Sequence, residues 1–405
     1  MKIKPFKALR PEKDMAAQVA SPPYDVVDTE QAIELARDNP LSFLHVVRSE
    51  IDLNESDRKN PDMVYSKALH NFQLLIEKNV LAREADPSLY VYRLSKDGHA
   101  QHGIVACCSV EDYEKGVIKR HEKTREDKEA DRAMHVSKLR AHTGQVFLAY
   151  RQRHDIDMIV DGICKEQSLF DFEAIDGVRH TIWRAPDAGQ LVTAFDSVAE
   201  AYIADGHHRA ASAARVAQEQ RADTQAKTGT MESDWFPCVI FPANQLRILP
   251  YNRCVSGLHN IATLDLPAKI SSFFTVTPAD SGEPEASGHI RMYFKGQWYD
   301  LSWQPEANPD PVKSLDVNIL QTRLLAPVFG IENPRTDPHM DFVGGIHEEE
   351  ELKRRVDSGK ADVAFSLWPV SVEQLMAVSD SNKLMPPKST WFEPKLRSGL
   401  LVHTF

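Results

Sequence analysis

The spacing of hydrophobic positions divides the chain into segments of strand-like and helix-like pattern. Apolar residues recur every three or four positions from Met63 to Val80, which predicts an amphipathic helix over 61–79. Two short apolar runs flank Lys96-Asp97-Gly98, which predicts a hairpin of strands 89–94 and 103–110. Other runs predict strands at 3–8, 41–48, 147–150, 180–185, 202–204, 236–242, 246–253, 290–295, 297–303 and 363–367.

Helices are expected between many of these strands. Asp28 with Gln31, and Ser371 with Gln374, have the spacing of a capping box at a helix start. Further helices are predicted at 121–132, 210–216, 314–328 and 348–356, a short polar helix or turn at 11–19, and a polar connection at 218–233. Alternating strands and helices predict an α/β fold.

A change in composition points to two domains. Residues 278–288 are rich in proline, glycine, serine and acidic side chains, as in an exposed loop. We expect a ligand-binding domain over 1–260 and a second α/β region over 261–405, whose last loop returns to the site of the first.

Composition excludes several classes of protein. A hydrophobic content of 42% and a charged content of 26% are those of a globular protein. No apolar run has the length of a membrane span, the first residues lack a signal peptide, and five cysteines form no Cys-x-x-Cys pair. A cytoplasmic protein is expected. The net charge of -11 disfavours nucleic acid as a partner.

The clearest candidate site is the turn Asp205-Gly206-His207-His208-Arg209. It joins a predicted strand to an alanine-rich helix, so the first helical N–H groups and the helix dipole favour an anion there. Arg209 can fork onto phosphate or carboxylate oxygens, and the two histidines can carry protons. A metal site and an ordinary exposed turn are the alternatives.

Other candidate residues lie on stiff or charged segments. Asp25 follows Pro22-Pro23, and can orient a substrate amine, hold a magnesium-bound water, or cap the next helix. Arg48, at the end of a predicted strand, is a candidate second anion ligand. On a helix over 121–132, the side chains of four residues would share one face; these are His121, Thr124, Lys128 and Arg132. A solvated helix laced with salt bridges is the alternative.

A loop near the end of the chain completes the set. Met385-Pro386-Pro387 is followed by Lys388, Ser389 and Thr390, whose charge and hydroxyls suit a phosphate. A plain connector, with Trp391 and Phe392 packed on the core, is the alternative.

These motifs carry a resemblance. The turn at 205–209 resembles the phosphate-binding turn of the ParB/sulfiredoxin-like superfamily, and the chain is similar to a prokaryotic family named domain of unknown function 1015. The stretches that carry the match are 22–27, 121–124, 205–209 and 385–390. The resemblance implies a ParB/sulfiredoxin-like core, with Glu122 as general base or magnesium ligand, His121 as acid or base, and Lys128 and Arg132 on phosphate.

Because the superfamily includes free-serine kinases, the resemblance implies phosphoryl transfer to or from serine or phosphoserine, in either direction. Asp205, His207 and His208 are then candidate catalytic groups. Mg²⁺ is the expected cofactor, with ATP or ADP as candidate nucleotide, and a small phosphorylated metabolite or amino acid as partner. The alternative is a regulator that binds a nucleotide or phosphometabolite without turnover. Metal ligands and homo-oligomerisation are left open.

Overall fold

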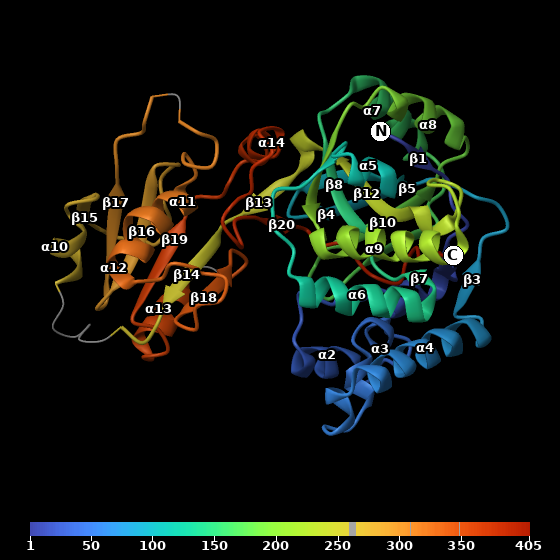
Figure 1. Cartoon of the computed structure of the whole chain (residues 1–405), viewed down its shortest axis with the longest axis horizontal. Helices are drawn as coiled ribbons and strands as arrows, with labels where there is room; N and C mark the ends of the chain where they lie inside the picture. Colours follow the sequence, from blue (N-terminus) through green and yellow to red (C-terminus); the bar gives the residue numbers. More distant parts are fainter. Residues whose placement is uncertain (259–264, 308, 348) are drawn as a thin grey trace. The chain divides into compact units, whose positions relative to one another are not determined.

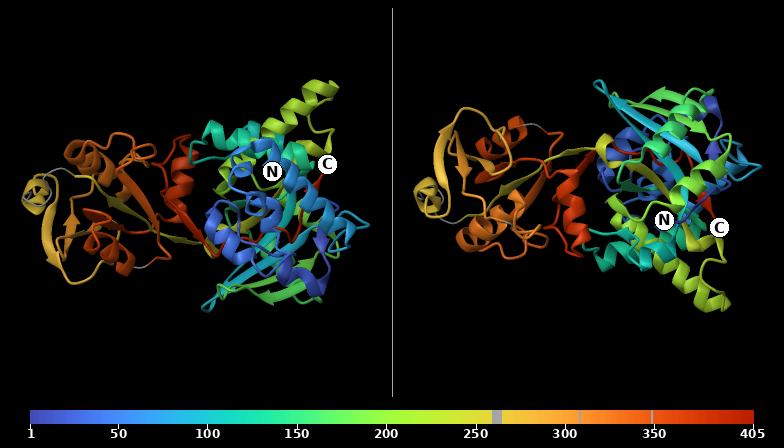
Figure 2. Two further views of the ribbon diagram at one scale, coloured as in Figure 1. Left: turned by 90° about the horizontal axis from the view of Figure 1, so that it is seen from below. Right: turned by 90° about the horizontal axis from the view of Figure 1, so that it is seen from above.

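The computed structural model describes residues 1–258, 265–307, 309–347 and 349–405, and divides the chain into two compact units. Unit 1 comprises Met1–Arg120, Thr124–Leu246 and Pro394–Phe405, whereas unit 2 comprises His121–Lys123 and Arg247–Glu393. Both chain termini therefore lie in unit 1 (Figure 2). The division falls after Leu246; the expected boundary at 260/261 lies outside the described residues, and the two-domain assignment stays a prediction.

The main sheet of unit 1 has the strand order β6-β11-β8-β12-β5-β4-β10-β9, with β1 paired to β5 (Figure 1). Its strands are β1 (Ile3–Lys4), β4 (Tyr90–Lys96), β5 (His99–Ser109), β6 (Ile118–Lys119), β8 (Val146–Tyr150), β9 (Phe170–Glu173), β10 (Arg179–Arg184), β11 (Ala201–Asp205) and β12 (Trp235–Pro242). β11 runs parallel to β6 and antiparallel to β8. Asp97 and Gly98 both have positive φ, of 51° and 76°, as the predicted β4–β5 hairpin requires.

One face of this sheet packs against helices whose apolar residues follow the helical period. α7 (His154–Ile163) buries Ile156, Val160 and Ile163 against the sheet. The other helices of this layer are α5 (Val110–Glu114), α8 (Ala188–Asp196) and α9 (His207–Thr224). The small alanines of α9 bring its backbone close to the strands, and Ala210 and Ala213 are fully buried.

A second core of unit 1 lies among helices. It contains α1 (Ala16–Val19), α2 (Thr29–Ala36), α3 (Leu44–Val47), α4 (Pro61–Glu77) and the end of α6 (Glu126–Leu139). The Asp28 capping box begins α2 as predicted, and Asn60 with Pro61 begins α4. The predicted strand at 41–48 is wrong, because this segment contains the helix α3. The side chains of a short apolar run can be buried in one helical turn as well as in a strand.

Short pairings complete unit 1. These are β2 (Leu9–Pro11) with β3 (Leu81–Arg83), and β7 (Ala141–His142) with β21 (His403–Thr404). The β7–β21 pair ties the last residues of the chain to unit 1. The predicted first strand at 3–8 is shorter than expected and ends at Lys4.

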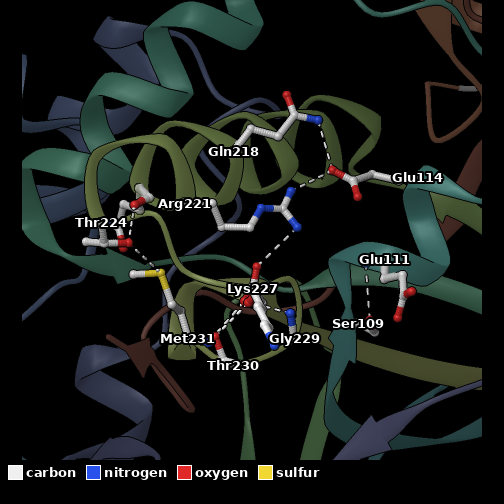
Figure 3. A network of polar contacts seen from close by, with 12 residues as sticks. Ser109, Glu111, Glu114, Gln218, Arg221, Thr224, Lys227, Gly229, Thr230 and Met231 are labelled. Carbon is white, nitrogen blue, oxygen red and sulfur yellow. Dashed lines mark hydrogen bonds and ion pairs between the residues drawn. The ribbon is translucent and has the colours of Figure 1, made fainter.

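The helix α9 is longer than the sequence pattern indicated. A polar connection was expected from Gln218, but the helix continues to Thr224 because its polar side chains find partners (Figure 3). Gln218 and Arg221 both donate to the Glu114 carboxylate of α5, at 2.9 and 2.8 Å. Asp234 accepts hydrogen bonds from the backbone N–H groups of residues 229 and 231, which closes the loop after the helix.

Unit 2 is a smaller α/β layer. Its sheet has the order β15-β17-β16-β19-β14-β18, and a separate pair joins β13 to β20. The strands are β13 (Arg247–Leu249), β14 (Tyr251–Val255), β15 (Thr275–Ala279), β16 (His289–Phe294), β17 (Gln297–Ser302), β18 (Met340–Gly344), β19 (Val363–Leu367) and β20 (Trp391–Glu393). The β16–β17 hairpin is confirmed, with Gly296 at φ 79° in its turn.

Most helices of unit 2 lie where the sequence predicts them, but the first of them was not predicted and the helix expected at 314–328 is divided. The helices are α10 (Leu266–Ile270), α11 (Asp316–Leu320), α12 (Ala326–Phe329), α13 (Glu349–Asp357) and α14 (Val372–Asp380). A π-helical turn over Gln321–Leu325 joins α11 to α12, and Gly330 ends the run at φ 73°. The Ser371 capping box begins α14 as predicted, whereas Glu348, expected to begin α13, lies outside the described residues. The predicted α/β fold is confirmed.

Candidate functional site

The turn after β11 takes a conformation that only glycine adopts easily. Gly206 has φ 92° and ψ 32°, and α9 begins at the next residue. A Cβ atom at Gly206 would lie 3.4 Å from Arg209 Cδ and 3.5 Å from Val146 Cα. The Gly206 N–H donates to Asp205 Oδ1 at 3.0 Å. Strand, glycine and helix therefore meet as predicted, and the backbone comes close to the neighbouring strand.

Asp205 is an ionised carboxylate in a largely buried place. Its Oδ2 lies 3.3 Å from Lys395 Nζ, and its side chain is 28% exposed. Burial alone would raise the pKa of Asp205, but the charges of Lys395 and Arg209 more than offset it and hold the pKa well below its usual value. Sequence reasoning did not propose Lys395, although it follows the Met385–Thr390 loop closely.

The Arg209 guanidinium is already engaged on two of its nitrogens. Nη2 donates to both oxygens of Asp25, at 2.7 and 2.9 Å, and Nη1 donates to the Gln145 carbonyl at 2.9 Å. Burial would lower the pKa of Arg209, yet the carboxylates of Asp25 and Asp205 raise it above its ordinary value. The structure thus brings Asp25 and Arg209 together as an ion pair. Asp25 does not cap α2, because Asp28 does.

Tyr24 lies between two arginines. Its ring centre is 4.3 Å from the Arg132 guanidinium carbon and 5.5 Å from that of Arg209. Burial, and next to it the Asp25 charge, raises the pKa of Tyr24 to about 12, so the phenol keeps its proton at neutral pH. Tyr24 was missed as a site residue, although it stands beside Asp25 on the proline-stiffened segment.

The charged run at 121–132 does not form one helix. α6 begins only at Glu126, and Arg125 before it is extended, with φ -95° and ψ 130°. Acidic residues suit the first turn of a helix, which explains this start. The predicted shared face is therefore wrong, since His121 and Thr124 precede the helix, while Lys128 and Arg132 lie on it.

Residues of this run lie beside the turn within unit 1. His208 Nε2 accepts a hydrogen bond from the Arg125 N–H at 3.1 Å, which orients the imidazole. Thr124 Oγ1 donates to Glu129 at 3.3 Å, and Lys128 is exposed. His207 is buried, with 6% of its surface exposed.

His121 and Glu122 belong to unit 2, together with the last predicted loop. The His121 carbonyl accepts from the Met385 N–H at 2.8 Å, and its Nε2 lies 3.4 Å from Thr390 Oγ1. Glu122 lies 3.7 Å from a guanidinium nitrogen of Arg335. The structure therefore groups His121 with Thr390, whereas Glu122 lies beside Arg335.

The loop over 385–390 is held by its own contacts. The buried Arg253 donates to the carbonyls of Pro387 and Lys388, at 3.0 and 2.9 Å, and burial lowers its pKa to about 9. The Ser389 hydroxyl donates to the Pro386 carbonyl at 2.6 Å, and Lys388 Nζ lies 5.4 Å from the Tyr251 ring centre. Their role as phosphate ligands stays a prediction.

Arg48 has partners away from the turn. It follows α3, forms an ion pair with Glu50 at 3.0 Å and donates to Thr29 Oγ1 at 3.0 Å. These contacts give it a structural role at the start of α2. A function as second anion ligand stays a prediction.

The expected Mg²⁺ is not matched by a protein ligand set. Within the described residues, no group of three or more histidines, cysteines, aspartates or glutamates is placed to hold a metal ion. In the same residues, no helix combines the length and apolar character that crossing a bilayer demands.

The sequence pattern of the family described as "Protein of unknown function (DUF1015)" matches residues 3–318, and the chain belongs to this family. The match contains the 205–209 turn and the 121–124 stretch, whereas the 385–390 loop lies beyond it. No curated protein matches the chain.

Several solved structures are distantly similar. A conserved hypothetical protein from Pyrococcus furiosus is 12% identical, with a TM-score of 0.37, over 73% of this chain and 94% of that one. A free serine kinase in complex with AMP is 11% identical, with a TM-score of 0.36, over 73% and 91%. SbnI with a C-terminal truncation from Staphylococcus aureus is 11% identical, with a TM-score of 0.40, over 74% and 87%.

Proposed function

We propose that the chain is a phosphoryl-transfer enzyme acting on serine or phosphoserine, with ATP or ADP as candidate partner. The 205–209 turn carries this proposal, because it places an ionised aspartate, an ammonium group and a guanidinium at the start of an 18-residue helix. The positive end of the helix dipole favours a phosphate at that point. The choice of serine and of the nucleotide rests on the resemblance of this turn to that of free-serine kinases.

Each group at the turn has a role in this proposal. Gly206 lets the backbone approach the phosphate, Lys395 and Arg209 supply positive charge, and Asp205 orients the hydroxyl or water that attacks. His208, held by the Arg125 N–H, is the candidate proton carrier. Phosphoryl transfer depends mainly on positioning and charge neutralisation. The two ion pairs of the turn hold its charged groups in position, and the helix dipole adds positive potential at the phosphate.

A second candidate is binding of a phosphorylated ligand without turnover. In this candidate Arg209, whose two Nη groups donate to Gln145 and Asp25, contributes positive charge without a bidentate contact to the ligand. This candidate keeps the same ligand class and differs only in chemistry.

Phosphorus NMR of the purified protein with Mg²⁺ distinguishes phosphoryl transfer from ligand binding without turnover. The protein is offered phosphoserine alone, and then serine with ATP, ADP or pyrophosphate. New phosphate or phosphoserine signals establish transfer and its direction. Asp205→Asn should abolish the signals, and Asp155→Asn, which removes a surface ion pair with Arg153, should leave them unchanged. No conversion, together with a ligand-induced rise in melting temperature, selects the binding protein.

The role of Glu122 is tested separately. If Glu122 is the base, Glu122→Gln leaves ligand affinity intact and stops turnover, because the amide keeps the shape and loses the basic oxygen. Full turnover in this variant removes Glu122 from the mechanism without affecting the roles assigned to the turn.

A further inference from the structure

A cavity of 30 Å³ lies inside unit 1 on the side of Arg209 that faces Tyr24. Arg132 and Arg209 both line it, and their side chains are 13% and 10% exposed. The remaining polar lining comes from hydroxyls and imidazoles, and no carboxylate takes part among the described residues. Both guanidinium groups are also ion-paired, Arg132 with Asp131 at 2.8 Å and Arg209 with Asp25 at 2.7 Å, but neither aspartate lines the space. The described lining therefore presents two cationic groups and no carboxylate, which suits an anion.

Two buried polar atoms at this cavity lack a partner within the described residues. They are Nε of Arg209 and Nε2 of His142. The other nitrogens of Arg209 donate to Asp25 and Gln145, so Nε–H is the donor left over. Leaving a buried donor without an acceptor costs about 1–3 kcal/mol of folding free energy. Such atoms normally form a hydrogen bond to a ligand or to water.

The size of the space limits what can enter. One water molecule needs roughly 10–15 Å³, so 30 Å³ admits a group of a few heavy atoms. A tetrahedral phosphate head fits this description, and a sugar or a base does not. The hydroxyls of Thr143 and Ser398 line the same space and can donate to phosphate oxygens.

We propose that this cavity is a binding site for one phosphate group, with Arg209 Nε, Arg132 and the hydroxyls of Thr143 and Ser398 as donors. It differs from the position in front of the first N–H groups of α9, although Arg209 borders both. The inference rests on the proposed function in so far as the ligand is phosphorylated. It adds a second phosphate position on the inner side of Arg209, for free phosphate or the head of a monoester.

Gly144 offers a precise way to close the cavity. It lines the space, and a Cβ atom there would lie 3.6 Å from Arg209 Cδ, 3.7 Å from Nε and 3.9 Å from Ser398 Oγ. These are ordinary contacts, so alanine fits without displacing its neighbours while covering Nε. Gly162→Ala is the matched control, because a Cβ atom there meets nothing within 4 Å.

Calorimetric titration with inorganic phosphate, phosphoserine and chloride, on the full chain, tests the proposal. Gly144→Ala should weaken phosphate binding by about tenfold or more with an unchanged melting temperature, and Gly162→Ala should not. Stronger binding of phosphoserine than of phosphate identifies a monoester, and equal binding identifies the free ion. If Gly144→Ala unfolds, Ser398→Ala serves instead and should weaken binding several-fold.

Unchanged phosphate affinity in both variants overturns the proposal, and so does chloride binding as tight as phosphate. The outcome is independent of catalysis. Phosphoryl transfer can fail in the NMR experiment while phosphate still binds in the cavity. Conversely, phosphate affinity that falls in Lys395→Met and survives in Gly144→Ala places the ion at the turn alone.

Discussion

Asp205 and Arg209 stand four positions apart, and each is neutralised by a residue far away in sequence. Lys395 lies 190 positions after Asp205, and Asp25 lies 184 positions before Arg209. The two pairs keep a carboxylate charged in a place where burial alone would protonate it. The charge of the turn is therefore a property of three distant stretches of chain.

Replacing Lys395 by methionine should lower the stability of unit 1 by about 1–3 kcal/mol at pH 7, because Asp205 then keeps a less compensated charge. The pKa of Asp205 is depressed in the folded protein, so its contribution is present above the unfolded pKa of about 3.9 and is lost as pH falls below it. The difference between the variant and the natural protein should shrink below about pH 4.

Urea unfolding between neutral and acid pH measures this difference. Lys115→Met is the control, since its pair with Glu111 is solvent-exposed and should contribute less than about 1 kcal/mol. An equal loss in both variants, or a loss that does not change with pH, would show that the Lys395 pair does not control Asp205.

At the scale of elements, the predictions that succeeded had a local cause. The β11–Gly206–α9 unit, the β4–β5 hairpin and the capping box of α2 are each determined by residues adjacent in sequence. The predictions that were wrong concern segments whose adjacent residues give no clear signal. The apolar run that became α3 has no period to separate strand from helix. Charges of both signs throughout 121–132 obscure the acidic residues that favour the start of α6 at Glu126. Partners such as Lys395 and Tyr24 carry no spacing signal at all.

Gly206→Ala should destabilise the protein and weaken ligand binding more than Gly98→Ala. Both positions have positive φ, but the new Cβ atom at Gly98 has open space around it. Alanine at either position is strained by about 1–2 kcal/mol. Only at Gly206 does the new Cβ atom meet Arg209 and Val146. We expect a larger fall in melting temperature and weaker ligand binding for Gly206→Ala, measured by differential scanning calorimetry and titration. Equal effects would mean that the close approach at the turn is unimportant.

At the scale of the whole molecule, unit 1 contains several histidines that burial keeps neutral. Burial is the main reason why the pKa values of His135 and His180 are lowered to about 3, and why those of His142 and His403 lie below the ordinary value. Between the folded and unfolded pKa values the unfolded chain binds more protons, so stability rises with pH there. Unit 1 should lose stability as pH falls below about 6.5, by up to about 1.4 kcal/mol per pH unit for each histidine.

Hydrogen exchange of the β8 and β12 amides, followed from pH 7 to pH 5 after correction for the intrinsic exchange rate, reports on unit 1 alone. His135→Gln should reduce the pH dependence by about one proton, whereas the exposed His70→Gln should not. An unchanged slope in the His135 variant would show that this side chain does not titrate on unfolding.

Removing Pro394–Phe405 should destabilise unit 1 and leave unit 2 folded. The segment supplies Lys395 to Asp205, Arg397 to His180 and strand β21 to β7. Amide exchange should become fast in β8 and β12 and stay slow in β16 and β19. Loss of protection in both units would show that the segment stabilises more than unit 1.

The division of unit 1 along the chain also sets an order for its formation during protein synthesis. Residues 247–393 must leave the ribosome before the last twelve residues can join the first 246. At roughly 5–20 residues per second this takes on the order of 7–30 s, during which Asp205 has no ammonium partner and β7 has an open edge. A nascent chain in that interval exposes an unpaired strand and an uncompensated carboxylate, and both remain exposed until residues 394–405 have been synthesised.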